Sequence, residues 1–217
     1  MIPVHEGRRD RNMREKRERI AAAAAQLFEE RGFLAVTTQE ISERADVAAG
    51  TLFRYAASKS ELLLMVYNEE FRRAVATGRE RAAVSDDVVD AVTRLVLPVV
   101  ERAVERPENS AVYQRELLFG AATDVHRSVG LALIAELEAA IADRLIAEAA
   151  ARGLPTDEDR ARLASGSVFA VTHLAIARLS TGAHPGYDMT EDLRAQITQI
   201  VTGFLTWTNG PDAHAAE

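Results

Sequence analysis

Hydrophobic residues recur along this chain at the three- and four-residue spacing of amphipathic helices, and strand-like alternation is absent. A helix expected over residues 12–31 shows the pattern clearly. Its apolar face is made by Ile20, Ala23, Ala24, Leu27 and Phe28. Gly32 then ends it. Alanine, leucine, arginine and glutamate, which are strong helix formers, dominate throughout. The pattern predicts an all-α protein.

Glycine, proline and capping residues divide the chain into about nine predicted helices. Thr37 and Glu40 form a capping box for a two-turn helix that runs to Ala45. A second short helix is expected at about residues 49–55. Ser58 and Glu61 form another capping box, for a helix that continues to about Arg81.

The remaining boundaries follow from the same signals. Asp86 or Asp87 caps a helix that runs to Arg106 and contains Pro98, which should kink it. Asn109 begins a short helix through Phe119. The last three predicted helices begin after Asp124, at a Thr156 cap, and at an Asp188–Glu191 capping box; they end near Gly153, Ser180 and Trp207.

The net charge of −7 is divided unevenly along the chain. Residues 1–60 carry 11 Lys and Arg against 9 Asp and Glu, whereas residues 61–217 carry 15 against 24. Residues 1–19 alone have seven basic and four acidic side chains. A basic head suits contact with phosphates, which is short-ranged in salt, and a solvated arm is the alternative. We expect a disordered basic arm over residues 1–11, a DNA-binding domain over 12–60, a helical domain over 61–208 and a frayed tail over 209–217.

Several classes of function are not expected. There is no cysteine, which excludes disulfides and thiolate metal sites and agrees with a cytoplasmic address. Apolar runs are short and interrupted by charge, so we expect neither a membrane span nor a secretory signal. No histidine pair has metal-binding spacing, and no nucleophile elbow or glycine-rich phosphate loop is present. We therefore expect no enzyme, no metal and no cofactor, the alternative being a helical enzyme with an incidental DNA-binding motif.

Residues 37–60 have the layout of a helix-turn-helix. The two short helices are joined by a tight turn at residues 46–48, and helices this short need tertiary packing. Ile41, Ala45, Val47 and Leu52 would provide it against the first helix. Plain packing of a helical bundle is the alternative interpretation of this pattern alone.

A longer run of positions points to a known family. It comprises Ile20, Ala24, Leu27-Phe28, Gly32-Phe33, Thr37-Thr38, Ile41, Ala45-Asp46-Val47, Gly50-Thr51-Leu52-Phe53-Arg54-Tyr55, Ser58-Lys59 and Glu61-Leu62-Leu63. Over residues 12–65 the chain resembles the tetracycline-repressor (TetR) family. The resemblance implies DNA contacts from Thr38, Ala48, Ala49, Gly50, Thr51, Phe53, Arg54, Tyr55 and Lys59. Family members usually carry phenylalanine where this chain has Ala56, which puts local packing in doubt.

For the rest of the chain the resemblance implies a helical ligand-binding domain and a homodimer through the last two long helices, at about residues 157–180 and 189–208. Two stripes agree with this, although either could instead be intramolecular core. They are Leu163, Gly166, Ala170, Leu174 and Ala177 on one helix, and Leu193, Ile197, Val201, Phe204 and Leu205 on the other.

Candidate ligand-binding residues combine apolar side chains with a few polar anchors, although each could equally be core. They are Leu97, Tyr113, Glu116, Leu117, Phe169, His173 and Ile176. We expect a transcriptional repressor that leaves double-stranded operator DNA when a small-molecule effector binds. A ligand-independent DNA-binding or architectural protein is the alternative.

Overall fold

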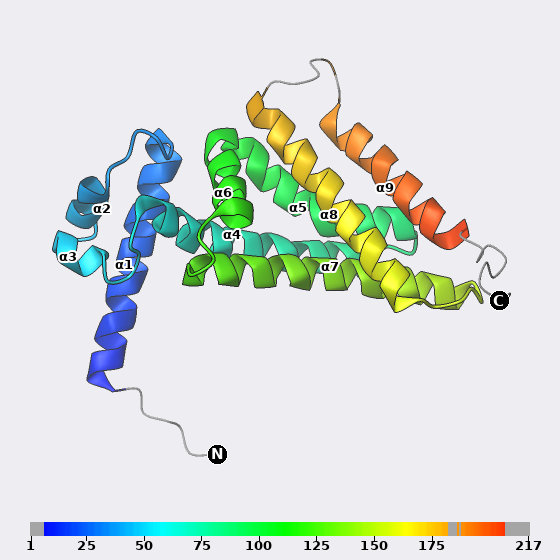
Figure 1. Ribbon diagram of the computed structural model, residues 1–217, viewed down its shortest axis with the longest axis horizontal. Helices are drawn as coiled ribbons and strands as arrows, with labels where there is room; N and C mark the ends of the chain where they lie inside the picture. The colour runs from blue at the N-terminus through cyan, green and yellow to red at the C-terminus, as the bar shows by residue number, and fades with distance from the viewer. Residues whose placement is uncertain (1–6, 182–185, 187, 207–217) are drawn as a thin grey trace, which may run out of the picture. The chain divides into compact units, whose positions relative to one another are not determined.

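The computed structural model describes residues 7–181, 186 and 188–206, and these residues form nine helices and no strand (Figure 1). The predictions of an all-α fold and of about nine helices are confirmed. The helices are α1 (Arg8–Arg31), α2 (Thr38–Arg44), α3 (Ala49–Leu52), α4 (Lys59–Ala82), α5 (Val88–Glu105), α6 (Pro107–Phe119), α7 (Val125–Ala151), α8 (Glu158–Thr181) and α9 (Met189–Thr206).

The chain divides into two compact units. The head unit comprises Met1–Arg73 and Arg102–Leu133, and the body unit comprises Ala74–Glu101 and Ile134–Glu217. Helices α1, α2, α3 and α6 belong to the head unit, and α8 and α9 belong to the body unit. The division falls within α4, α5 and α7. The domain limits expected from the sequence stay a prediction, and the predicted tail, with Trp207, lies outside the described residues.

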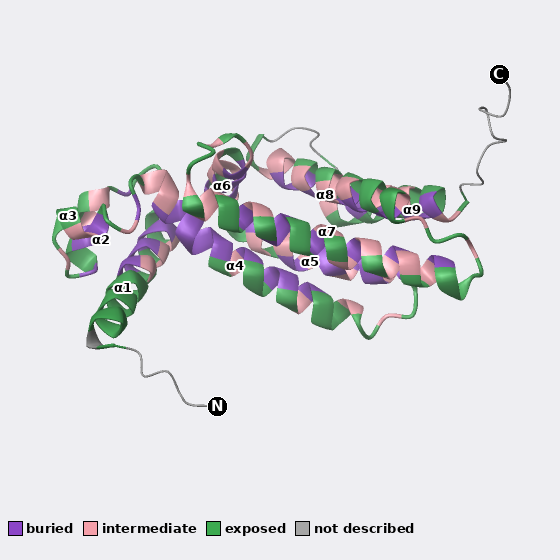
Figure 2. Ribbon diagram, turned by 60° about the horizontal axis from the view of Figure 1, so that its bottom comes forward, coloured by how far each residue is buried: buried purple, intermediate pink, exposed green. Residues whose placement is uncertain are grey.

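Helix α1 begins four residues earlier than expected, at Arg8, so part of the predicted arm is helical. Gly7 precedes it in an extended conformation, and Asp10 in the first turn complements the helix dipole. Residues 9–19 are exposed throughout, whereas the second half of α1 buries Ile20, Leu27 and Phe28 (Figure 2). The first half of α1 is therefore exposed and rich in basic residues, and its second half belongs to the core.

Local hydrogen bonds fix the short helix α2 at both ends. The predicted capping box is present: the Glu40 amide donates to Thr37 Oγ1 at 3.2 Å, and the Thr37 amide donates to Glu40 Oε2 at 2.8 Å. At the other end the Val47 amide donates to the Ser42 carbonyl and the Asp46 amide to the Glu43 carbonyl. This pattern terminates a helix through a left-handed residue. Asp46 fills that position with a φ of 51°.

Helix α3 is shorter than expected and ends at Leu52 instead of about Tyr55. The Arg54 amide donates to the Thr51 carbonyl at 3.2 Å, and the Tyr55 amide donates to the Leu52 carbonyl at 2.9 Å. Such three-residue bonds tighten the final turn of a helix. We call residues 49–55, comprising α3 and this tight turn, the recognition segment.

A buried asparagine joins α6 to the end of α1 inside the head unit. Asn109 is fully buried; its Nδ2 donates to the Phe28 carbonyl at 3.0 Å, and its Oδ1 accepts from the Phe33 amide at 2.7 Å. The expectation that Asn109 begins the helix is wrong, because α6 begins at Pro107. Proline suits the first helical position, where the missing N–H would have no helical partner.

The other predicted caps have mixed outcomes. The Ser58 cap on α4 is present, since the Glu61 amide donates to Ser58 Oγ at 3.1 Å, but the Glu61 carboxylate accepts from the Ala57 amide instead of closing the box.

Asp87 caps α5 through the Asp90 amide. Helix α8 is capped by Asp157, and not by Thr156, through the Arg160 amide. The remaining predicted caps, Asp124 on α7 and Asp188 on α9, accept from first-turn amides.

Helices α8 and α9 pack side by side in the body unit (Figures 1 and 2). The α9 stripe predicted from the sequence is buried within the chain at Leu193, Ile197, Val201 and Phe204. On α8 the buried positions are different from the predicted stripe, and Leu163 and Leu174 are exposed. The expectation that the chain has no membrane span stays a prediction. Helix α8 is long and apolar enough by composition to cross a membrane, because its charges lie mostly in its first turns.

Candidate nucleic-acid interface

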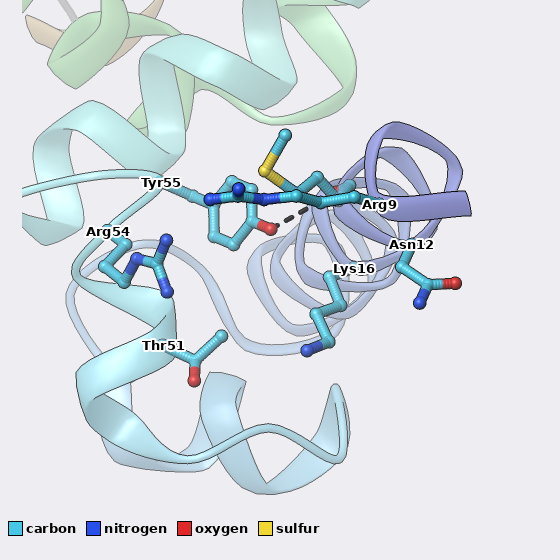
Figure 3. Close-up of a pocket in the computed structure, with 7 residues that line it drawn as sticks. Arg9, Asn12, Lys16, Thr51, Arg54 and Tyr55 are labelled. Atoms are coloured by element: carbon cyan, nitrogen blue, oxygen red, sulfur yellow. Dashed lines mark hydrogen bonds between the residues drawn. The ribbon is translucent and has the colours of Figure 1, made fainter. Parts of the chain in front are cut away.

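A shallow groove of about 510 Å³ lies between the exposed half of α1 and the recognition segment (Figure 3). Helix α1 contributes one wall and the recognition segment the other, with Lys16 and Arg54 on opposite sides in Figure 3. The groove is lined by Arg9, Asn12, Met13, Lys16, Thr51, Arg54 and Tyr55. Three cations around a groove with amide, hydroxyl and phenol groups suit a polyanion that also offers hydrogen-bonding edges.

The basic residues of the head fall into two groups. Arg19, Arg31 and Arg44 form ion pairs with Asp46, Glu40 and Glu30, which tie α1 to α2 and to the turn after it. By contrast, Arg9, Lys16 and Arg54 form no ion pair within the described part of the chain. The paired cations link α1 to α2 and its following turn at the surface, and the unpaired cations have the charge to meet a phosphate.

Glu40 shows the electrostatics of the first group. The hydrogen bond from Arg31, at 2.6 Å, and those from Thr37 lower the pKa of Glu40 to about 2. The Arg31 guanidinium also donates to the Ala35 carbonyl at 2.7 Å. The carboxylate that caps α2 thus stays charged and fixes the start of the helix that carries Thr38.

The predicted DNA-contact residues are accessible as a set. Ala48, Ala49, Gly50, Phe53 and Arg54 are exposed, and Thr38, Thr51, Tyr55 and Lys59 are partly exposed. A Cβ atom at Gly50 would meet nothing within 4 Å. The start of α3 is therefore a flat surface of small side chains, which allows close approach of another molecule to its backbone. The assignment of these nine residues to DNA stays a prediction.

Lys59 has an additional, structural role that sequence reasoning missed. Its ammonium donates to the Phe33 carbonyl and to the Val36 carbonyl, each at 2.8 Å, and lies 4.2 Å from the centre of the Phe33 ring. Desolvation lowers the pKa of Lys59, while Glu108 and Glu40 act in the opposite direction. Lys59 thus fixes the loop between α1 and α2, and an ammonium group with three N–H donors keeps one donor beyond these two hydrogen bonds.

Ala56 occupies the position where the resemblance noted from the sequence implies phenylalanine. It is buried, with 2% of its surface exposed, and its amide donates to the Leu52 carbonyl at 3.2 Å. Leu52 itself is fully buried. The recognition segment is therefore anchored from beneath by these two residues.

Sequence reasoning missed the α1 side of the groove. Arg9, Asn12 and Lys16 lie at positions i, i+3 and i+7, so a helix that starts at Arg8 presents them on one face. The available signal was the excess of basic residues before Arg19. The expected arm over residues 1–11 takes in Arg9 but not Asn12 or Lys16, because no side-chain cap marks the start of α1 at Arg8.

The predicted ligand-binding residues are split between the two units. In the head unit, Tyr113 and Leu117 are buried, and Glu116 pairs with Arg115 at 2.7 Å. In the body unit, Ile176 is buried and Leu97, Phe169 and His173 are partly buried. The His173 and Phe169 rings lie 5.1 Å apart, and burial lowers the pKa of His173. The set stays a prediction. Over residues 7–181, 186 and 188–206 there is no cluster of three or more His, Cys, Asp or Glu suited to a metal ion.

Comparison with known proteins agrees with this geometry. A model of the family described as bacterial regulatory proteins, tetR family, matches residues 20–66. The HTH-type transcriptional repressor KstR of Mycobacterium tuberculosis is 32% identical over 146 residues, which are 67% of this chain and 63% of that protein. The chain thus matches slightly less than two thirds of that repressor's length.

Two solved structures share the fold. A TetR transcriptional regulator from Rhodococcus sp. RHA1 superposes with a TM-score of 0.68 at 20% identity, over 87% of this chain and 97% of that chain. Thermus thermophilus FadR, a TetR-family transcriptional repressor solved with lauroyl-CoA, gives a TM-score of 0.67 at 24% identity, over 90% and 97%. The matched family consists of regulators and not of enzymes. The chain belongs to the TetR family of bacterial regulatory proteins.

Proposed function

We propose that this protein is a sequence-specific DNA-binding repressor whose recognition segment enters the major groove. The observation that carries the proposal is the groove lined by Arg9, Lys16 and Arg54, three cations that pair with no acid in the described residues, beside the exposed start of α3. Phosphate contacts position a protein on the duplex, and side chains on base edges provide specificity. Arg9 and Lys16 are assigned to phosphates, and Thr51, Arg54 and Tyr55 to the base-reading edge.

The proposed repressor is a homodimer whose two subunits meet through α8 and α9. Leu163, Ser167, Ala170 and Leu174 follow one another at three- and four-residue spacing on α8 and are exposed in the single chain. Residues 163–177 and residues 195–206 contain no Asp, Glu, Lys or Arg. A helix face without charge is typical of the core of a subunit interface. Pairing would hold two heads for half-sites about 34–36 Å apart.

The proposed effector, which would release the protein from its operator, is a small molecule. Acyl-CoA thioesters are the first class to test. The support is the fold shared with FadR, which was solved with lauroyl-CoA, and the repressor function stated for KstR. Binding would reduce operator affinity by about 5–150-fold, corresponding to about 1–3 kcal/mol of coupling. Such a regulator works in the bacterial cytoplasm. A ligand-independent DNA-binding or architectural protein remains the alternative.

The first experiment selects DNA sites from a random pool with the full chain and then measures affinity over a range of salt concentrations. Lys16→Ala should reduce the slope of log affinity against log salt by about one unit for each phosphate that Lys16 neutralises. Arg11→Ala is the matched control, because Arg11 is an exposed α1 cation that does not line the groove. Equal slopes for both variants would remove the groove from the interface, and failure to select any sequence would overturn specific recognition.

The second experiment titrates the operator complex with lauroyl-CoA, with free coenzyme A as control. A decrease in operator affinity with lauroyl-CoA alone supports an acyl-CoA effector. No decrease removes acyl-CoA from the proposal. If a wider set of metabolites also leaves affinity unchanged, the ligand-independent alternative is favoured.

A further inference from the structure

The recognition segment is held from outside the helix-turn-helix at its last residue. Carbonyl groups at the end of a helical turn lack partners within the helix. The Tyr55 carbonyl lies 3.2 Å from His126 Nε2 in the first turn of α7. A carbonyl only accepts, so the histidine tautomer with a proton on Nε2 is the donor. The Tyr55 hydroxyl donates to the Met13 carbonyl of α1 at 3.2 Å. Tyr55 is thus fixed at its backbone and at its side-chain end.

His126 is itself held in place through its backbone. Its amide donates to Oδ1 of the α7 cap Asp124 at 2.7 Å, and its carbonyl accepts from Asn68 Nδ2 on α4, also at 2.7 Å. Asn68 Oδ1 in turn accepts from the Tyr113 hydroxyl of α6 at 2.8 Å. Asn68 is 3% exposed and Tyr113 is 9% exposed. Burial raises the pKa of Tyr113, which keeps its hydroxyl protonated as the donor.

The close approach of α7 to this pair requires a glycine. A Cβ atom at Gly130 would lie 2.5 Å from Leu117 Cδ1 and 2.7 Å from Asn68 Oδ1. Both distances are far below van der Waals contact, so a side chain here would displace Leu117 and Asn68 or move α7 away from them. Gly130 therefore lets α7 sit at the distance at which Asn68 reaches the His126 carbonyl. The four polar residues Tyr113, Asn68, His126 and Tyr55 form one hydrogen-bonded series, which we call the His126 relay.

We propose that His126 is a positioning residue for DNA binding: it holds the end of the recognition segment in the orientation that presents Thr51 and Arg54, and Asn68 and Tyr113 hold His126. This rests on the proposed DNA-binding function. His126 lines no part of the groove. Its effect on DNA is therefore indirect and passes through Tyr55. A satisfied polar series that is buried at Asn68 and Tyr113 and partly buried at His126 restricts the conformations of the elements that it joins.

The test compares His126→Ala, His126→Gln and Ser128→Ala in the full chain. Gln can place an amide donor near the Nε2 position, and Ser128 lies in the same turn of α7, with its hydroxyl bonded inside that turn to the Asp124 carbonyl. Amide hydrogen exchange over residues 49–57 is measured without DNA. His126→Ala should exchange about three- to ten-fold faster in this stretch, as expected for removal of one hydrogen bond. His126→Gln should restore part of the protection, and Ser128→Ala should match the wild type.

The same variants are then titrated with the selected operator. His126→Ala should weaken affinity by a similar factor at every salt concentration and leave the salt slope unchanged, because every cation that meets a phosphate is still present. Tyr113→Phe should change exchange and affinity in the same direction and by less. A merely structural role would instead speed exchange equally across α4 and α7.

Unchanged exchange over residues 49–57 in His126→Ala overturns the positioning role, as does a uniform increase across the head. A reduced salt slope would also overturn it, because His126 would then contact phosphate directly. If the wild type selects no operator, the proposed function fails. The exchange measurement still decides whether His126 fixes the recognition segment.

Discussion

The head unit and the α8–α9 pair are stabilised in different ways. In the head, side chains hydrogen-bond to particular backbone atoms: Thr37 and Glu40 at the start of α2, Lys59 at the loop before it, and Asn109 at the end of α1. In the α8–α9 pair, buried apolar side chains such as Leu193 and Ile197 dominate. A directed hydrogen bond demands one residue type at one position. Apolar packing accepts many combinations of similar volume.

The two kinds of stabilisation also suit the different roles that we propose for the head and for the α8–α9 pair. Short helices such as α2 and α3 are unstable alone, so the proposed DNA-reading surface built from them needs fixed polar contacts. The α8–α9 pair also has directed contacts, from Arg160 to the Phe204 carbonyl at 2.6 Å and from Arg178 to Asp192 at 3.3 Å, but its long helices depend on them less. It presents Leu163, Ala170 and Leu174 to solvent in the single chain. The head depends on hydrogen bonds between its own residues, whereas the proposed role of the α8–α9 pair depends on the apolar side chains that α8 exposes.

The largest expected effect comes from the uncovered face of α8. Ala170→Glu places a charge in the middle of the proposed interface, where it would lose hydration without a partner. Dimer dissociation should become at least about 100-fold easier, because an uncompensated buried charge is worth about 3–5 kcal/mol. Sedimentation velocity over a concentration series measures this. Operator affinity should fall with the dimer.

Arg162→Glu is the control for Ala170→Glu, because Arg162 is exposed in the charged first turns of α8. It should leave the oligomeric state unchanged. A dimer that survives Ala170→Glu would place the interface elsewhere. The head and the α8–α9 pair would then differ in how they are packed, and not in a role of α8 in dimer formation.

The second effect concerns the interior of the head. Asn109→Ala leaves the buried Phe33 N–H and Phe28 carbonyl without their side-chain partner. The free energy of unfolding should fall by about 2–3 kcal/mol, measured by urea denaturation. Glu108→Ala is the control, since Glu108 is exposed and its one hydrogen bond within the described part of the chain is from the Leu34 amide, at 3.2 Å. Equal losses in both variants would show that the buried amide contributes nothing special.

How much of the head could be predicted from the sequence depends on how far apart along the chain the contacting residues lie. The Thr37–Glu40 capping box and the Ser58 cap were predictable because local hydrogen bonding constrains residues three apart. The start of α1 was not, because no side-chain cap marks it. The end of α3 was not, because its C-cap is Phe53 in a right-handed helical conformation and no glycine follows it before Ser58. The structural roles of Lys59 and Asn109 depend on partners 23 to 81 positions away, and periodicity carries no information about such pairs. The α1 side of the groove was missed for a similar reason: it needs both the true start of α1 and its position beside α3.

A third, smaller effect separates the two roles of Lys59. Lys59→Met keeps the aliphatic stem and removes the ammonium that donates to the Phe33 and Val36 carbonyls. The free energy of unfolding should fall by about 1–2 kcal/mol. The salt slope of operator binding should fall by about one unit for each phosphate that the ammonium neutralises. A fall in stability with an unchanged slope would make Lys59 a structural residue only.

The smallest effect is a pH dependence at the start of α2. The pKa of Glu40 is lowered from 4.5 in the unfolded chain to about 2 in the folded head, first by its hydrogen bond from Arg31. The contribution of this carboxylate is therefore complete above pH 4.5 and is lost as the pH falls from 4.5 toward 2. Glu40→Gln should have a shallower decline of stability over that interval, measured by thermal unfolding at a series of pH values. Glu43→Gln is the control, because Glu43 lies on the same helix and accepts from Gln39 without an arginine partner among the described residues. Both variants could instead show the same dependence of stability on pH as the wild type. The capping box would then depend on its geometry and not on its charge, and the polar contacts of the head would need no ionised group at the start of α2.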